Sequence, residues 1–118
     1  MNKLAAIVGI VVMLASSSGG ALAADLAAAK QNYKTFCTKC HGPEGKGDGT
    51  AAATLKTKPR DFTDCARMAK ETDDVLFKVI KNGGPAAGFS ADMQAWSSGF
   101  EDDEIRDLIA YVRTFCKK

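Results

Sequence analysis

The stretch Cys37-Thr38-Lys39-Cys40-His41 decides most of what the sequence indicates about fold and chemistry. Two cysteines three positions apart, with a histidine directly after the second, are typical of covalent attachment of a c-type haem. One helical turn places both sulfurs on the same side, where each can form a thioether with a haem vinyl group. The adjacent imidazole then reaches the iron as its proximal ligand. The motif therefore predicts a haem bound through Cys37 and Cys40, with His41 as an iron ligand.

Two other interpretations of the motif use the thiols without haem. A Cys-x-x-Cys pair serves thiol–disulfide exchange in proteins of βαβ organisation, but that interpretation gives His41 no role. A zinc site needs a fourth ligand, and the neighbours Cys40 and His41 do not easily turn toward one tetrahedral metal. We favour haem, because its attachment gives a role to all three side chains.

The first residues have the pattern of an export signal. Lys3 supplies a positive charge, residues 4–14 form an uncharged apolar run, and Ala21-Leu22-Ala23 is a small-x-small cleavage site. We expect cleavage after Ala23, which leaves residues 24–118 as one domain in the periplasm. A retained membrane anchor is the alternative, but the eleven apolar residues are too few for a bilayer core, which takes about 20. We therefore expect no membrane span.

Hydrophobic periodicity predicts an all-α fold, because apolar residues recur at helical spacing in three segments. Asp25 is a suitable N-cap for the first segment, which runs into the haem motif, and Thr72 caps the second, which Gly83 ends. The third begins near residue 101 or 102, where acidic residues suit the helix dipole. The three apolar stripes comprise Leu26, Ala29, Tyr33, Phe36 and Cys40; Val75, Leu76, Val79 and Ile80; and Ile105, Leu108, Ile109, Val112 and Phe115.

The segments between these helices contain glycine and proline. Residues 42–49 predict a tight turn that lets the backbone pass close to the haem, and residues 82–88 predict a second loop. Residues 50–71 are ambiguous and have room for two short helices. A domain of this size has a marginal core of its own, which a large apolar cofactor would complete.

Charge is unevenly distributed along the chain. The formal net charge is +2, but residues 30–60 hold seven basic residues against two acidic ones, around the haem motif. A positive region at the haem edge would steer a redox partner with an acidic docking patch, in a salt-sensitive encounter. An ordinary solvated surface is the alternative. Nothing in the chain resembles a nucleic-acid-binding module.

Cys65 and Cys116 are not needed for the haem. In an oxidising compartment, two remaining thiols predict a disulfide. Two separate thiols are the alternative, since the sequence does not show whether their Cα atoms come close enough for a bond.

Taken together, these features resemble a small monohaem class I cytochrome c of the bacterial periplasmic type, over essentially the whole of residues 24–118. The resemblance implies three main helices and long loops around one haem, with the first and last helices crossing near Tyr33 and Tyr111. The matching stretches are residues 37–42, the glycine-rich loop, Lys58-Pro59-Arg60-Asp61-Phe62, residues 76–84, Met93-Gln94-Ala95-Trp96, and the helix that begins around Asp103-Glu104-Ile105.

The resemblance also implies a methionine as the second iron ligand. Of the two methionines outside the export signal, Met93 precedes the last helix, where the family places its ligand. We expect Met68 to fill the core instead. Gln94 stands where the family often has a proline, so the chain departs from the family pattern beside the ligand.

Two further residues have roles implied by the family. The carbonyl of Pro59 would accept a hydrogen bond from Nδ1 of His41, which fixes the ring and raises its basicity; a plain turn proline is the alternative. The indole N–H of Trp96 would donate to a haem propionate, although simple packing against the haem is equally consistent.

The function that the resemblance implies is one-electron transfer between redox proteins. No substrate bond is made or broken, so we expect an electron-transfer protein rather than an enzyme, carrying one haem c as a monomer. Two alternatives stay open: a ligand-binding or sensor haem protein with a labile sixth ligand, and a cytochrome subunit docked to a larger oxidoreductase.

Overall fold

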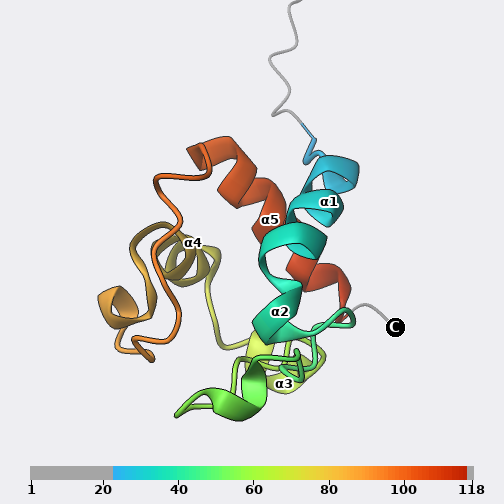
Figure 1. Ribbon diagram of the computed structural model, residues 1–118. Coiled ribbons are helices and arrows are strands. Elements are labelled where there is room, and N and C mark those ends of the chain that lie inside the picture. Colours follow the sequence, from blue (N-terminus) through green and yellow to red (C-terminus); the bar gives the residue numbers. More distant parts are fainter. Residues whose placement is uncertain (1–22, 117–118) are drawn as a thin grey trace, which may run out of the picture.

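The computed structural model describes residues 23–116, and within them the fold is all-α, as predicted. The export signal predicted for the N-terminus, apart from its last residue, lies outside the described residues. None of the described helices is both long enough and apolar enough to cross a membrane. The elements in chain order are α1 (Leu26–Phe36), α2 (Thr38–His41), the 3₁₀ helix η1 (Ala52–Thr54), α3 (Cys65–Met68), α4 (Asp73–Asn82), the 3₁₀ helix η2 (Gly84–Ala87) and α5 (Asp102–Thr114) (Figure 1).

The three main helices begin where the sequence predicts. The side chains of Asp25 and Thr72 cap α1 and α4, each accepting a hydrogen bond from the backbone N–H three residues further on, at 3.0 and 3.2 Å. Helix α5 starts with a capping box between Glu101 and Glu104. These contacts satisfy N–H groups that have no partner inside the helix. The two predicted caps are therefore confirmed, as is the predicted start of the third helix near residue 101 or 102.

The predicted first helix differs from the structure at the haem motif. We expected it to continue to Cys40, but α1 ends at Phe36 and a separate turn, α2, begins at Thr38. The Thr38 hydroxyl donates to the carbonyl of Tyr33 at 3.2 Å. Side chains of this kind compete with helical backbone hydrogen bonds. Because of this break, Cys40 and His41 lie on a separate turn, α2, that follows the end of α1.

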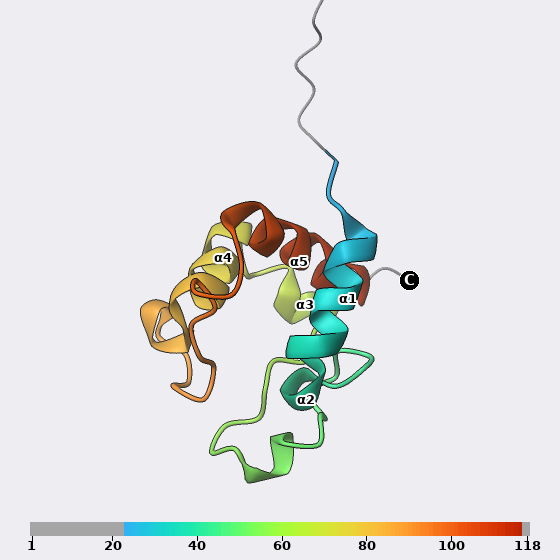
Figure 2. The same ribbon diagram turned by 45° about the horizontal axis from the view of Figure 1, so that its top comes forward.

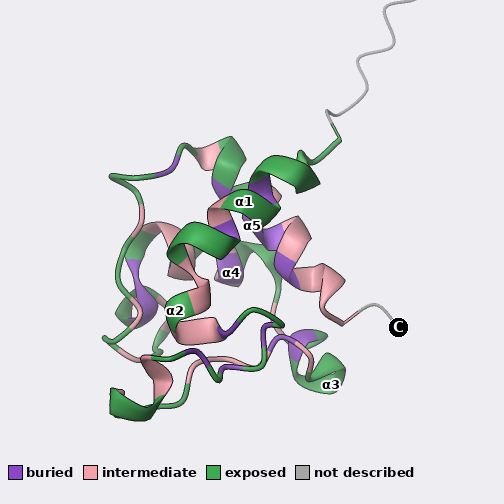
Figure 3. Cartoon of the chain, turned by 45° about the vertical axis from the view of Figure 1, so that its right-hand side comes forward, coloured by how far each residue is buried: buried purple, intermediate pink, exposed green. Residues whose placement is uncertain are grey.

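The core lies where α1 and α4 pack against α5. Figure 2 shows α1 lying across α5, and in Figure 3 buried segments gather where the three helices meet. The rings of Tyr33 and Tyr111 are 5.4 Å apart between centroids, which confirms both residues at the crossing of the first and last helices. The buried cluster comprises Tyr33, Phe62, Met68, Leu76, Phe100, Ile105, Leu108, Ile109 and Val112.

Fewer of the apolar residues predicted to face the core are buried in α4 than in α5. Only Leu76 is buried in α4, whereas Val79 and Ile80 are half-buried. All three side chains line a cleft, which explains why they are apolar without being covered by the chain itself. The apolar face of α4 thus belongs to the site as well as to the core.

Candidate functional site

A cleft with a volume of about 1080 Å³ lies beside this core. Its walls come from α2 and residues 55–62 on one side and from α4 and residues 88–96 on the other. In Figure 1 these are the teal and green segments and the yellow-to-orange segments. Ligand pockets usually have volumes of about 300–1,000 Å³. The cleft is therefore large enough for a bulky cofactor.

The cleft brings together every residue of the haem motif that has a predicted role. Cys37, Cys40 and His41 all line it, and all three are half-buried. Burial, with a smaller contribution from neighbouring Cys40, raises the pKa of the Cys37 thiol to about 11. At neutral pH this thiol is protonated, unlike the thiolate that disulfide exchange requires. This environment therefore does not favour the thiol–disulfide interpretation of the motif.

His41 is oriented by two contacts. Its Nδ1 lies 3.2 Å from the carbonyl oxygen of Arg60, and its ring stacks on Phe62 with centroids 4.5 Å apart. Since a carbonyl can only accept, Nδ1 must carry the hydrogen, and Nε2 keeps its lone pair. Burial lowers the pKa of His41, which favours the neutral imidazole. A neutral ring held through one nitrogen is the form that binds a metal through the other.

The carbonyl that faces His41 belongs to Arg60 and not, as predicted, to Pro59. The Pro59 carbonyl instead lies beside Gly47, where any Cβ atom would collide with it. Gly47 has a φ of 74°, a conformation that glycine adopts without strain. The glycine loop therefore packs against the 58–62 segment and fixes which carbonyl faces the ring. The sequence located the segment, but this one-residue shift depends on the tertiary contact.

Of the two methionines, the structure places only Met93 in the cleft wall. Met93 lines the cleft and also a smaller apolar recess of about 40 Å³, which His41 and Cys37 line as well. Its backbone is fixed, since its carbonyl accepts from the N–H of Gly84 at 2.8 Å. Met68 is 2% exposed and belongs to the hydrophobic core, away from the cleft lining. Met93 therefore lies on the cleft and Met68 does not, while the role of Met93 as a ligand stays a prediction.

Trp96 also lines the cleft and the recess. Its ring packs with those of Phe36 and Phe100, each with a centroid distance of 5.8 Å, and its backbone N–H donates to Ile80 at 2.9 Å. These contacts give Trp96 a packing role in the wall. Donation from its indole N–H to a haem propionate stays a prediction.

The charged residues of the cleft wall are balanced in sign. Four are basic and four are acidic: Lys39, Lys58, Arg60 and Arg67, and Asp61, Asp64, Glu71 and Asp92. The excess of basic residues in the sequence around the motif is therefore not concentrated on the cleft itself. Both wall lysines are exposed to solvent, where a partner protein could reach them.

Cys65 and Cys116 lie close together, and neither lines the cleft. Their Cα atoms are 5.2 Å apart. Disulfides usually join Cα atoms separated by about 4.4–6.8 Å, so the geometry permits the predicted bond.

Comparison with known proteins agrees with this fold. The family model described as "Cytochrome C oxidase, cbb3-type, subunit III" matches residues 24–112. Cytochrome c-554(547) of Halothiobacillus neapolitanus is 28% identical over 92 residues, which cover 78% of this chain and 98% of the relative. Cytochrome c6 of Thermosynechococcus vestitus is 28% identical over 102 residues, covering 86% of this chain and 80% of the relative.

A solved structure, the KustC0563 c-type cytochrome, superimposes with a TM-score of 0.61 and 26% identity, covering 75% of this chain and 98% of that one. An all-α shell beside a cleft that carries a Cys-x-x-Cys-His motif defines the class of c-type cytochromes. The chain belongs to the family of the matching model and is a small monohaem class I cytochrome c. Family membership implies covalently bound haem c and a role in electron transfer.

Proposed function

We propose that residues 24–118 form a periplasmic one-electron carrier with a single haem c, attached through Cys37 and Cys40, and with His41 and Met93 as axial ligands. One observation carries the proposal: a single cleft is lined by both cysteines, the histidine and Met93, while Met68 is buried elsewhere. The apolar side chains of the wall suit the faces of a porphyrin, so the residues present fit this group.

The chain's own residues explain how the site would work. When bound, the haem iron supplies a centre that accepts and releases one electron. His41 offers Nε2 because the Arg60 carbonyl holds Nδ1–H, and Met93 offers a thioether from a loop fixed by backbone hydrogen bonds. With both ligands retained, no coordination position is left for a substrate. This ligand set supports a carrier rather than an enzyme.

The walls of the cleft would keep water from the ligands. Aromatic rings from Tyr33, Phe62, Trp96 and Phe100 line the small recess that His41 and Met93 also line. Packed side chains in an apolar site change position little when charge changes nearby. A site of this kind lowers the structural rearrangement that accompanies each electron transfer.

Partner proteins would reach the site from the exposed edge of the cleft. The lysines Lys39 and Lys58 are exposed there, but the charges of the cleft wall are balanced, so the case for a partner with an acidic patch rests on the basic excess of residues 30–60. We propose that the monomer binds such partners transiently and that association slows as salt is added.

The ligand assignment is tested by visible spectra of the protein matured in a host that attaches haem c. We expect the oxidised wild type to show a low-spin spectrum with the far-red sulfur-to-iron band, and Met93→Ala to lose that band. Met68→Leu is the matched control, because it changes a methionine that does not line the cleft. A band that survives Met93→Ala would refute the assignment.

A second function is favoured by one finding, the description of the matching family model as a subunit of a cbb3-type oxidase. The chain would then be docked to a larger oxidoreductase instead of shuttling between partners. Purification from the native membrane under mild conditions separates the two. A docked subunit stays with the oxidase through gel filtration at high salt, whereas a shuttle elutes alone.

A further inference from the structure

Arg60 contacts both sides of the cleft. Its carbonyl oxygen faces Nδ1 of His41, and its guanidinium carbon lies 5.2 Å from the ring centroid of Phe89 on the opposite side. The backbone N–H of Phe89 donates to Gly84 at 2.9 Å, and the N–H of Gly84 donates to Met93 at 2.8 Å. A continuous chain of contacts therefore runs from the histidine through Arg60 to the methionine loop.

The Arg60 guanidinium is held in place by Glu71. Its Nη2 lies 2.8 Å from Oε1 of Glu71, and the two side chains are only 20% and 17% exposed. At this exposure water screens the pair less than it screens a surface ion pair. The planar guanidinium can thus bind the carboxylate and lie over an aromatic ring at the same time.

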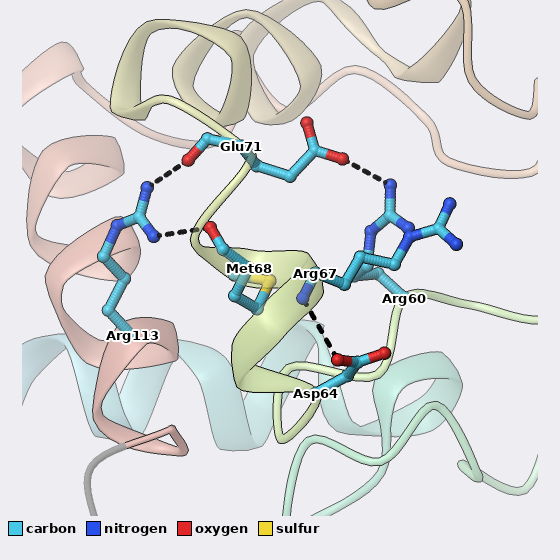
Figure 4. A network of polar contacts seen from close by, with 6 residues as sticks. All are labelled: Arg60, Asp64, Arg67, Met68, Glu71 and Arg113. Carbon is cyan, nitrogen blue, oxygen red and sulfur yellow. Dashed lines mark hydrogen bonds and ion pairs between the residues drawn. The ribbon is translucent and has the colours of Figure 1, made fainter.

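Glu71 is itself anchored to α5, as Figure 4 shows. Arg113 donates from Nη2 to the Glu71 carbonyl at 2.6 Å and from Nη1 to the Met68 carbonyl at 3.2 Å. Its Nε also donates to Asp73 at 2.6 Å. The carboxylate that orients Arg60 is therefore fixed to the last helix through its own backbone.

We propose that Arg60, held by Glu71, is a positioning residue that couples the histidine side of the cleft to the methionine side and keeps the Met93 loop closed on the iron. The inference rests on the His41/Met93 ligation proposed above. Any side-chain variant of Arg60 retains the carbonyl that faces His41. Loss of the guanidinium therefore leaves the His41 hydrogen bond in place and removes the contact with Phe89 on the methionine side.

Added imidazole measures how readily the methionine side opens, because it competes with the Met93 thioether for the oxidised iron. We expect Arg60→Ala to raise the affinity for imidazole about tenfold, comparable with the loss of one cation–π contact. Arg60→Lys keeps the charge without the planar group, so its affinity should fall between those of Arg60→Ala and the wild type. Glu71→Gln should raise the affinity as well, because the guanidinium loses its charged partner.

Arg106→Ala is a matched control. Arg106 pairs with Asp103 at 2.8 Å, and its guanidinium carbon also lies 5.2 Å from an aromatic centroid, that of Phe77. It does not line the cleft. This variant removes the same kinds of contact elsewhere on the molecule, so its imidazole affinity should match that of the wild type.

Phe89→Leu tests the same contact from the other side if Arg60→Ala folds poorly. Phe89 is 38% exposed and lies outside the core cluster, and the variant keeps the Arg60–Glu71 pair intact. It should also raise imidazole affinity. Affinities of Arg60→Ala and Phe89→Leu equal to that of Arg106→Ala, with the far-red band present in the wild type, would overturn the coupling alone. A wild type without that band would overturn the proposed ligation and this inference with it.

Discussion

At the scale of single residues, Tyr33 joins the haem motif to the core. It is 2% exposed, and its hydroxyl donates to the carbonyl of Gly42, directly after the motif, at 2.7 Å. Its ring packs against those of Tyr111 and Phe115 on the other side of the helix crossing. One side chain therefore links α1, α5 and the start of the glycine loop.

Tyr33→Phe should destabilise the protein and change its response to alkali. The lost hydrogen bond costs about 1 kcal/mol at neutral pH. Burial raises the pKa of Tyr33 above its unfolded value of about 10, so the unfolded chain ionises first as the pH rises. The stability contributed by the buried phenol is complete below that pH and is lost above it. Urea unfolding between pH 7 and 11 should show a smaller alkaline loss for Tyr33→Phe than for the wild type.

Tyr111→Phe is the comparison, because Tyr111 lies in the same crossing but is only half-buried. Its effect at pH 7 should be smaller than that of Tyr33→Phe. Parallel alkaline losses in wild type and Tyr33→Phe would show that another group controls stability at high pH.

At the scale of elements, the η2 turn and the Met93 loop are packed so closely that Gly84 has no room for a side chain. A Cβ atom there would collide with the carbonyl of Ser90 and would lie 3.3 Å from the Cβ of Met93. The absence of a side chain at this position lets the loop fold back onto the end of α4.

Gly84→Ala should therefore lower the free energy of unfolding by about 1–3 kcal/mol, the usual cost of overpacking. It should also weaken the far-red band, because the displaced segment carries Met93. Gly99→Ala provides the control, since its Cβ would meet nothing nearer than the Trp96 carbonyl at 3.7 Å. Equal stabilities of the two variants in urea would contradict the packing argument.

Elements with local signals were predictable and those set by tertiary contacts were not. Capping residues predicted the starts of α1 and α4, and acidic residues in the first turn predicted that of α5, because each signal acts within a few residues of the helix start. The break before α2 and the η2 turn within the predicted loop went unpredicted. The carbonyl that faces His41 belongs to Arg60 and not to Pro59 because of a tertiary contact, in which Gly47 packs against the Pro59 carbonyl.

The residues of the site likewise divide into those that the sequence predicted and those that it did not. The sequence predicted site roles for the motif cysteines, His41 and Met93, and all of them line one cleft in the structure. Phe62 beneath the imidazole and Phe89 beneath Arg60 were not singled out for these roles. An aromatic residue in a loop gives no sequence signal of which ring or cation it will face.

At the scale of the whole molecule, Cys65 at the start of α3 lies beside Cys116, which follows α5, although the two are 51 residues apart in sequence. The Arg113 contacts to residues 68, 71 and 73 tie the same two regions together without a covalent bond. The middle of the chain is thus fixed to the last helix at several points.

Reduction of the predicted disulfide should lower the free energy of unfolding by about 4 kcal/mol, as the chain-entropy model gives for a loop of this length. Urea unfolding of the haem-loaded protein with and without reductant measures the difference. A double variant, Cys65→Ser with Cys116→Ser, should be insensitive to reductant. Two titratable thiols in the protein as isolated would contradict the disulfide.

We propose that one haem, ligated on both sides, makes this chain a one-electron carrier. A potentiometric titration followed by visible spectroscopy tests it most directly. We expect one reversible transition with a one-electron slope, low-spin spectra in both oxidation states, and no spectral change when carbon monoxide is added to the reduced protein. A reduced form that is high-spin and binds carbon monoxide would contradict the claim and favour a ligand-binding or sensor protein.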